Sequence, residues 1–143
     1  MQGIHLSAAS TQESQIIQEG LTDYNILRIA SLPRTTIQKW DFVLKDAKGN
    51  LIGGINAEYV NWGILFISLL FVFENYRGLG LGARLLQHVE QLAKTQGGHL
   101  AHTDTLDFQG REFYLKQGYD VFGILEDCPR GHKRYYLKKT LSK

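Results

Sequence analysis

Apolar residues repeat with two periods along this chain, and each period predicts its own kind of element. Between Leu81 and Leu92 they recur every three or four positions, which predicts a helix with one buried face, ended by Gly97-Gly98. Residues 62–73 are almost continuously apolar, which is typical of a strand buried on both faces. The predicted order is β-α-α-β-β-β-α-β-α-β-β, with strands at 4–6, 40–44, 51–59, 62–73, 99–105, 119–125 and 134–140, and helices at 11–20, 24–30, 81–94 and 107–116.

Polar signals mark the ends of several of these elements. Ser10 is followed three residues later by Glu13, a capping-box pattern that predicts the start of the first helix. The turn at residues 46–50 contains Gly49, which can adopt a left-handed conformation, and it predicts a hairpin between the flanking strands. No repeat or linker interrupts the pattern, so residues 1–143 are predicted to form a single domain.

Length and composition narrow the class of protein without identifying a function. The chain has 143 residues, of which 43% are apolar, enough to bury the core of one domain. Its net charge of +2 is too small to predict a basic stripe, so no nucleic-acid partner is expected. Cys128 is the one cysteine, which excludes an internal disulfide and fits a reducing compartment. Neither a membrane span nor a signal peptide is predicted, so a soluble cytoplasmic protein is expected.

The strongest chemical signal is Arg77-Gly78-Leu79-Gly80-Leu81-Gly82-Ala83, between the long apolar strand and the amphipathic helix. Glycine lets backbone N–H groups turn toward one point and approach an anion closely. A helix start adds unpaired N–H donors and a partial positive charge. Residues 77–83 are therefore predicted to hold the phosphates of a ligand.

Other kinds of glycine-rich turn fit this segment less well. Gly78-x-Gly80-x-x-Ala83 satisfies the dinucleotide fingerprint, which would make the protein a nucleotide-dependent oxidoreductase. However, residues 74–77 separate the strand from the first glycine, and about sixty residues precede that strand, whereas a Rossmann domain begins with it. A Walker loop needs Gly-Lys-Ser/Thr, which is absent. A tight turn with a purely structural role is the remaining alternative.

Arg77-x-x-Gly80-x-Gly82 and Phe113-Tyr114-x-x-x-Gly118-Tyr119 form a pair of motifs further along the chain. Together they resemble the Arg/Gln-x-x-Gly-x-Gly/Ala signature and the aromatic-Tyr-x-x-x-Gly-aromatic element of the GNAT superfamily of acetyl-CoA-dependent N-acetyltransferases. Segments 20–25, 104–109 and 131–137 are similar to small bacterial members, so the resemblance covers nearly the whole chain. It implies an α/β (α+β) fold with a single mixed, mostly antiparallel twisted sheet and helices on both faces.

The resemblance implies acetyl-CoA as cofactor and no metal. The pyrophosphate would bind backbone N–H groups of the glycine turn, and the pantetheine arm would pair with the next strand edge like an added strand. One N–H of that edge, that of Val72, would polarise the thioester carbonyl. Many members carry Asn at the position of Asp107, which would either bond the pantetheine arm or cap the following helix. The predicted cofactor-binding residues are Leu70, Phe71, Val72, Arg77, Gly78, Leu79, Gly80, Leu81, Gly82, Ala83 and Asp107.

Acetyl transfer also needs an acid for the departing thiolate and a base for the amine. The resemblance implies Tyr114 as the acid, and an ordinary tyrosine pKa of about 10 keeps it protonated at neutral pH. Glu74, His102 and Asp104, near the ends of two strands, are the candidates for the base, with an ordered water as the alternative to all three. Cys128 has no visible paired base, so direct transfer is expected over an acyl-enzyme.

The acceptor is less defined than the cofactor. Tyr24 and Asn25 in the early helices, and His132 in the last predicted turn, are candidates for acceptor binding or for ordinary packing and turn roles. The predicted function is transfer of the acetyl group of acetyl-CoA to a primary amine of a small molecule or peptide. A non-catalytic acyl-CoA sensor on the same fold is the alternative, and Tyr114 favours the enzyme because a sensor needs no acid. The resemblance also allows a homodimer.

Overall fold

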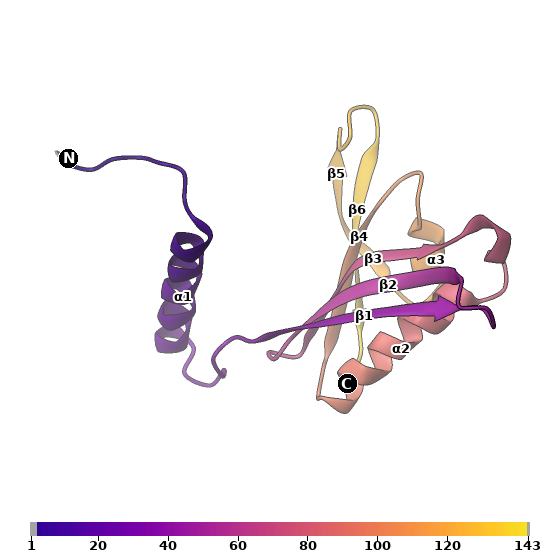
Figure 1. Ribbon diagram of the computed structural model, residues 1–143, viewed down its shortest axis with the longest axis horizontal. Coiled ribbons are helices and arrows are strands. Elements are labelled where there is room, and N and C mark those ends of the chain that lie inside the picture. The colour runs from indigo at the N-terminus through magenta and orange to yellow at the C-terminus, as the bar shows by residue number, and fades with distance from the viewer. Residues whose placement is uncertain (1–2, 143) are drawn as a thin grey trace. The chain divides into compact units, whose positions relative to one another are not determined.

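The computed structural model describes residues 3–142, which form two compact units divided after Thr35. The first unit contains the helix α1 (Thr11–Arg28), drawn in indigo in Figure 1. It starts with the predicted capping box. The Glu13 N–H donates to Ser10 Oγ over 3.1 Å, and the Ser10 N–H donates to Glu13 Oε1 over 2.8 Å.

Two sequence predictions for this unit are wrong. The helices predicted at 11–20 and 24–30 are the single helix α1, because an isolated glycine such as Gly20 weakens a helix without breaking its hydrogen-bond ladder. The strand predicted at 4–6 is not formed. A strand needs a neighbour for its hydrogen bonds, and the strands of the described chain all lie between residues 37 and 140.

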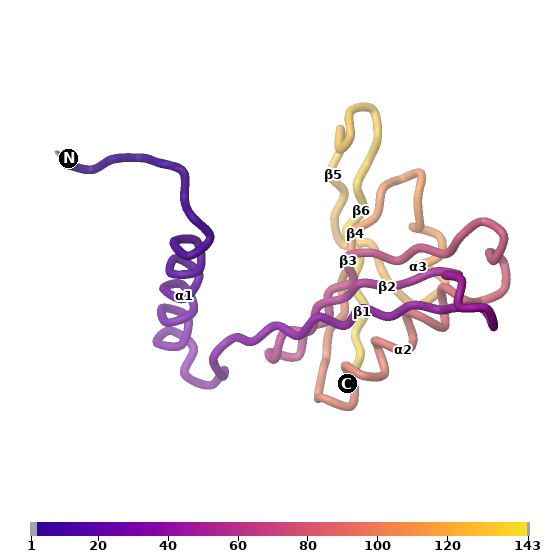
Figure 2. Tube along the Cα trace, viewed as in Figure 1, coloured from indigo at the N-terminus to yellow at the C-terminus, as the bar shows by residue number. Residues whose placement is uncertain are grey.

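The second unit is built on one six-stranded sheet with the order β1-β2-β3-β4-β6-β5. The β3–β4 pair is parallel, and the other neighbouring pairs are antiparallel, which confirms the predicted mixed, mostly antiparallel sheet. Figure 2 shows the path of the chain through it. The strands are β1 (Ile37–Lys45), β2 (Leu51–Val60), β3 (Ile64–Val72), β4 (Leu100–Leu106), β5 (Asp120–Glu126) and β6 (Lys133–Thr140).

The helices α2 (Leu81–Thr95) and α3 (Arg111–Lys116) pack on one face of this sheet (Figure 1). The presence of helices on both faces of the sheet stays a prediction, because α1 belongs to the other unit. No helix within residues 3–142 is long and apolar enough to cross a membrane. The α2 face has the predicted helical spacing, and the buried core residues from it and from the sheet include Leu85, Leu86, Val89, Ala93, Ile55, Ala57, Leu65 and Ile67.

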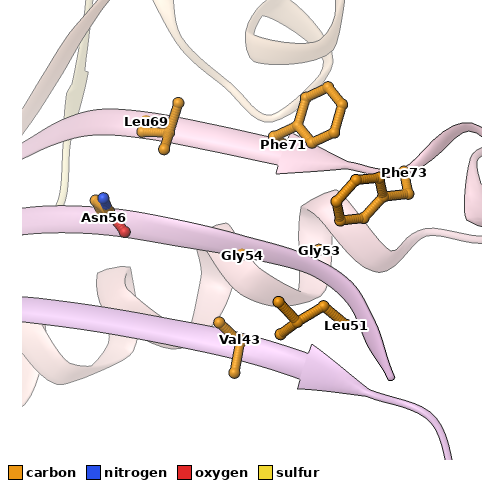
Figure 3. A pocket seen from close by; sticks show the side chains of 8 residues that line it. All are labelled: Val43, Leu51, Gly53, Gly54, Asn56, Leu69, Phe71 and Phe73. Atoms are coloured by element: carbon orange, nitrogen blue, oxygen red, sulfur yellow. The ribbon is translucent and has the colours of Figure 1, made fainter. Parts of the chain in front are cut away.

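The strand β3 is not buried on both faces along its whole length, as the continuous apolar run predicted. In its second half Leu69 is 55% and Phe71 is 47% exposed, whereas Leu70 and Val72 pack against the core on the other face. In this half of β3, successive side chains alternate between the core face and the exposed face, and the side chains on both faces are apolar. The exposed face holds the pocket of Figure 3, lined by Val43, Leu51, Gly53, Gly54, Asn56, Leu69, Phe71 and Phe73.

A buried polar network ties α2 to the last strands. Glu90 is 4% exposed, and its carboxylate accepts the Tyr119 hydroxyl over 2.7 Å and Lys139 Nζ over 3.0 Å. Burial, reinforced by the Glu90 charge, raises the pKa of Tyr119 well above its ordinary value. The carboxylate is therefore fully engaged, as a buried charge must be to avoid a large desolvation cost.

Candidate active site

The central strands β3 and β4 are paired along only part of their length. Their parallel pairing ends at Ile67 and Thr103, although both strands continue. At this last pair the buried Thr103 hydroxyl donates to the Ile67 carbonyl over 2.7 Å. We call the opening beyond it, between residues 68–72 of β3 and residues 104–106 of β4, the splay. Its closed end is the Ile67–Thr103 pair.

One edge of the splay offers the backbone of Leu70 and Val72. The Phe73 N–H donates to a carbonyl of β2 over 2.9 Å, and successive backbone groups of a strand point alternately to its two neighbours. Leu70 and Val72 therefore direct their N–H and C=O groups into the splay, whereas the backbone of Phe71 faces β2. In agreement, Arg77 Nε donates to the Val72 carbonyl over 2.8 Å. An extended molecule could pair with this edge as an added strand would.

The glycine turn carries β3 into α2 and leaves several amides outside the helix ladder. Gly78 and Gly80 both have φ of +77°, a left-handed conformation that favours glycine. The Arg84 N–H donates to the Gly80 carbonyl over 3.1 Å, so the amides of residues 81–83 precede the first bond of the helix. A Cβ on Gly78 or Gly80 would meet nothing within 4 Å. The turn thus presents N–H donors to open space at a helix N-terminus, an arrangement that suits a phosphate.

Neighbouring side chains fix the position of this turn. A Cβ on Gly82 would lie 3.3 Å from the Phe113 ring, a tight contact, so the close approach of α2 to α3 favours glycine there. The Arg77 guanidinium lies over the Phe71 ring at 5.3 Å from its centroid. Leu79 is 67% exposed, so it can contribute its amide to a ligand while its side chain faces solvent. Arg77 therefore lies at the rim between the turn and the splay.

Tyr114 lies on α3, with its hydroxyl at the closed end of the splay. Its side chain is buried, and its ring contacts Phe113 and Tyr119 edge-on at 5.2 and 5.4 Å between centroids. Thr103, a member of the last β3–β4 pair, is close enough to the Tyr114 hydroxyl to act on its pKa. Burial raises the pKa of Tyr114 to about 12, against the opposing effect of the nearby Thr103 hydroxyl. The side chain is therefore a neutral hydroxyl at neutral pH.

His102 and Asp104 lie on the face of β4 opposite to Thr103, because alternate residues of a strand point to opposite faces. The His102 ring is half-buried beside Phe66, 4.9 Å away between centroids. Burial lowers the pKa of His102, and the nearby Asp104 charge opposes that shift only in part. Asp104 is ion-paired with Arg134. His102 is therefore a neutral imidazole able to accept a proton, whereas the Asp104 carboxylate is already engaged.

Glu74 lies beyond the end of β3. It opens the short 3-10 helix η1 (Glu74–Tyr76), its side chain is exposed, and its carbonyl accepts the Arg77 N–H over 3.2 Å. This places Glu74 beside the glycine turn, at the open end of the splay. Tyr114 and Thr103 lie at the other end, which makes Glu74 the less suitably placed of the candidate bases.

Asp107 and His132 meet where the loop after β4 contacts the β5–β6 hairpin. Asp107 Oδ1 lies 2.9 Å from His132 Nδ1, and Oδ2 accepts the Lys133 N–H over 2.9 Å. The Lys133 hydrogen bond is the main cause of the lowered pKa of Asp107. The prediction that Asp107 caps α3 is wrong, because the N-cap is Gly110, whose N–H donates to Thr105 Oγ1 over 3.0 Å. Both carboxylate oxygens of Asp107 serve the hairpin, which does not favour a bond to a cofactor arm.

The remaining candidates are Tyr24 and Asn25 of the first unit and Cys128 of the segment between β5 and β6. Tyr24 and Asn25 are in α1, where the Arg28 guanidinium lies over the Tyr24 ring at 4.7 Å and the Asn25 carbonyl accepts a hydrogen bond near the end of the helix. Their assignment to acceptor binding stays a prediction. Cys128 Sγ lies 3.4 Å from Arg134 Nε. A guanidinium cannot act as a base, so this contact does not activate the thiol as a nucleophile.

Residues 15–119 match the acetyltransferase (GNAT) family. The chain belongs to this family. It is an acyltransferase, as its sequence predicted, and the family uses acetyl-CoA. The glycine turn, the splay and Tyr114 all lie within the matched residues.

Several proteins similar to this GNAT protein are named acetyltransferases. Blasticidin-S acetyltransferase of Streptomyces morookaense is 36% identical over 95 residues, which cover 66% of this chain and 69% of the relative. The crystal structure of an acetyltransferase from Bacillus cereus is 30% identical, with a TM-score of 0.85 over 98% of this chain and 99% of its own. A Bacillus anthracis protein solved in complex with acetyl coenzyme A shares the fold at 20% identity, with a TM-score of 0.63 over 71% of this chain and 62% of its own.

Two residues of this GNAT site escaped the sequence analysis. Thr103 carried a weak signal, since it occupies an inward position of an alternating strand, where a hydroxyl must find a partner. Arg134 carried none, because its pairing with Asp104 depends on the register of β4 against β6. The contacts of both residues could not be predicted, because their partners are distant in sequence.

Proposed function

We propose that this acetyltransferase moves the acetyl group of acetyl-CoA directly to a primary amine of a small molecule or peptide. The observation that carries the proposal is the buried Tyr114 on α3, whose hydroxyl stays neutral at neutral pH beside Thr103 of the last β3–β4 pair. A neutral hydroxyl at that point can protonate a departing thiolate, which a protein that only binds acyl-CoA would not require.

The residues of the turn and the splay fit the shape and charge of acetyl-CoA. The amides of residues 78–83 and the Arg77 side chain would hold the pyrophosphate, since they combine N–H donors with positive charge. The backbone of Leu70 and Val72 would pair with the amides of the pantetheine arm. Bound acetyl-CoA supplies the acetyl group as an activated thioester. An N–H of this strand edge, that of Leu70 or Val72, would stabilise the developing oxyanion, a contribution typically worth about 3–4 kcal/mol.

The acid and the base would approach the splay from its two faces. Tyr114, on the helix-covered face, would give its proton to the leaving sulfur. His102, on the other face and neutral at neutral pH, would take the proton of the attacking amine. Asp104 and Glu74 are the less favoured bases, because the first is paired with Arg134 and the second lies at the open end of the splay.

The acceptor is proposed from similarity and needs a direct screen. Blasticidin S is the first amine to test, because of the 36% identity to an acetyltransferase named for it. Tyr24, Asn25 and His132 remain the proposed acceptor contacts. A single-domain organisation, a cytoplasmic location and a homodimer also remain predictions.

The test measures release of free thiol from acetyl-CoA with a panel of amines that includes blasticidin S, polyamines, aminoglycosides and peptides. Amine-dependent thiol release is expected. Calorimetric binding of acetyl-CoA without turnover across the panel would support the sensor instead. Binding of a reduced nicotinamide cofactor with indifference to acetyl-CoA would overturn both.

Tyr114→Phe should lower kcat by about 100-fold, the usual contribution of a general acid, with little change in acetyl-CoA affinity. Tyr59→Phe is the matched control, because it removes another buried hydroxyl, one that donates to the Gln96 carbonyl over 3.2 Å away from the splay. It should leave kcat unchanged. Full activity of Tyr114→Phe, with chemistry shown to limit the rate, would remove Tyr114 from the mechanism.

A further inference from the structure

Asp107 and His132 form a hydrogen-bonded pair at the open end of the splay. Asp107 directly follows β4, and its N–H donates to the Lys133 carbonyl over 2.9 Å, which continues the β4–β6 ladder beyond Leu106. Because β3 and β4 are parallel, their carboxyl ends lie at the same edge of the sheet, where the splay opens. The Asp107–His132 pair therefore borders this opening from the β4 side.

Several contacts fix the orientation of the His132 ring. Nδ1 lies 2.9 Å from Asp107 Oδ1, and the ring contacts Phe108 edge-on at 5.1 Å between centroids. The His132 N–H donates to the Pro129 carbonyl over 2.8 Å, which holds the backbone of the turn. Asp107 is held in its turn, since its Oδ2 accepts the Lys133 N–H over 2.9 Å. Both side chains are thus oriented before any ligand binds.

The other ring nitrogen of His132, Nε2, is available to a ligand. A carboxylate only accepts hydrogen bonds, so Nδ1 carries the hydrogen toward Asp107, and in the neutral imidazole Nε2 is an acceptor. Nε2 has no hydrogen-bond partner among residues 3–142, and the side chain is 48% exposed. A neutral imidazole beside an ionised carboxylate carries one net negative charge, which favours a cation with an N–H to donate.

We propose that His132, oriented by Asp107, binds a second cationic nitrogen of the acceptor, an ammonium or amidinium group distant from the amine that is acetylated. The inference rests on the proposed function, since it names the class of acceptor that this site takes. His132 is a binding residue in this proposal. Asp107 is a positioning residue, because it acts through the ring that it holds.

The spacing along β4 sets the length of this acceptor. The reacting amine would lie beside His102, the proposed base, which is five residues before Asp107. An extended chain rises by about 3.3 Å per residue, so the two positions are roughly 16 Å apart along the strand, less what the side chains span toward a ligand. The acceptor is therefore an extended molecule with nitrogens near both ends, as in a polyamine.

The cations around the Asp107–His132 pair leave its negative charge in place. The Arg134 guanidinium is paired with Asp104, and Lys133 Nζ lies 3.9 Å from the Glu126 carboxylate. Arg130 is exposed in the same turn, where salt and water screen its charge. Among the described residues, none of these three cations forms an ion pair with the carboxylate of the pair. A positively charged end of an acceptor therefore has a negative partner here.

The test compares spermidine with octylamine, an amine of similar length that has a single nitrogen. Both are assayed with acetyl-CoA and the full chain. The parent enzyme should have a kcat/KM for spermidine about 10-fold or more above that for octylamine, the gain expected for one hydrogen bond to a charged group. Equal values for the two amines would overturn the inference.

His132→Asn removes Nε2 but keeps a side-chain N–H that can still donate to Asp107. It should raise the KM for spermidine by about 10-fold or more, with little change in kcat or in the KM for acetyl-CoA. Asp107→Asn should raise the KM for spermidine in the same direction, because a neutral amide holds the ring less strongly. His88→Asn, which changes an exposed histidine of α2, is the control and should leave these constants unchanged. His132→Ala replaces His132→Asn if that variant does not fold.

The remaining outcomes separate this inference from the proposed function. An unchanged KM for spermidine in His132→Asn, or a rise in the KM for acetyl-CoA alone, would overturn the inference. Failure to acetylate spermidine, while other amines of the panel are acetylated, would overturn it and leave the proposed function standing. Absence of amine-dependent thiol release across the whole panel would overturn both.

Discussion

Burial shifts the pKa values of Tyr114 and His102 in opposite directions, and both shifts favour the neutral side chain. The pKa of Tyr114 rises to about 12 and that of His102 falls below its ordinary value of 6.5. The cause is the same for both, because removal of water disfavours whichever form is charged. The proposed acid thus keeps its proton and the proposed base lacks one at neutral pH, so both are ready for the reaction.

His102→Gln should abolish the acidic limb of the pH profile of kcat/KM and lower the plateau by about 100-fold. In the parent enzyme, activity should fall as pH drops through the pKa of His102, below 6.5, because a protonated imidazole cannot accept a proton. The measurement is kcat/KM for the amine from about pH 5 to about pH 9, corrected for the fraction of neutral amine. His88→Gln, on α2 beside Phe42, is the control. An unchanged acidic limb in His102→Gln would assign the base to another group.

At the scale of elements, the junction of β3, the glycine turn and α2 makes the proposed anion site almost entirely from backbone. Besides Arg77, residue type matters there where a conformation or a close contact favours glycine, at Gly78 and Gly80 through their positive φ and at Gly82 through the Phe113 ring. This is why a short motif could be recognised in the sequence, since each of its glycines has a local physical reason.

Gly80→Asp should weaken acetyl-CoA binding by about 10-fold or more relative to Gly80→Asn, because a carboxylate would repel the phosphates over a short distance. Asn and Asp tolerate a left-handed residue similarly, so the pair differs mainly in charge. Gly49→Ala is the control for backbone strain, because Gly49 has a φ of +86° in the β1–β2 turn, outside the glycine turn at 77–83. It should leave the affinity for acetyl-CoA unchanged. The readout is the dissociation constant by calorimetry. Equal affinities for the Asp and Asn variants would mean that no phosphate lies at Gly80.

For the second unit as a whole, stability depends on contacts that join α2 to the strands after it. Glu90 is the clearest case, because it is buried on α2 and bonded to both Tyr119 and Lys139. The network links three separate parts of the chain across one core. Its loss should therefore affect the folding of the whole unit, with little dependence on the state of the splay.

Glu90→Ala should lower the free energy of unfolding by about 3 kcal/mol, because it leaves the Lys139 ammonium and the Tyr119 hydroxyl without their shared partner. Glu112→Ala is the control. It removes an exposed carboxylate 3.8 Å from Arg111, and a surface ion pair is worth less than about 1 kcal/mol. Urea denaturation of both variants gives the comparison. Equal small losses would show that the buried pair adds no more than a surface one.

Elements with short-range signals could be predicted, and elements that depend on neighbours could not. The amphipathic spacing of residues 81–94 predicted α2 within one residue of its observed end. The prediction of burial for all of 62–73 was wrong in its second half, because an apolar residue on the exposed face of β3, such as Phe71, looks the same in sequence as one on the core face. The strand predicted at 4–6 failed for a related reason, since strand formation requires a partner.

The sequence by itself determined the glycine turn at 77–83 and the amphipathic helix after it, because each depends on spacing within a few residues. Its resemblance to the GNAT superfamily implied Tyr114 as the acid candidate. The tertiary structure decided that Thr103 bonds the Ile67 carbonyl, that Arg134 pairs with Asp104 and that Asp107 holds the hairpin through His132. These contacts join residues far apart in the chain, and they are set by strand register and by where the β3–β4 ladder ends. A local motif can be recognised from neighbouring residues, whereas the partners that a side chain contacts across a sheet are defined only once the sheet has formed.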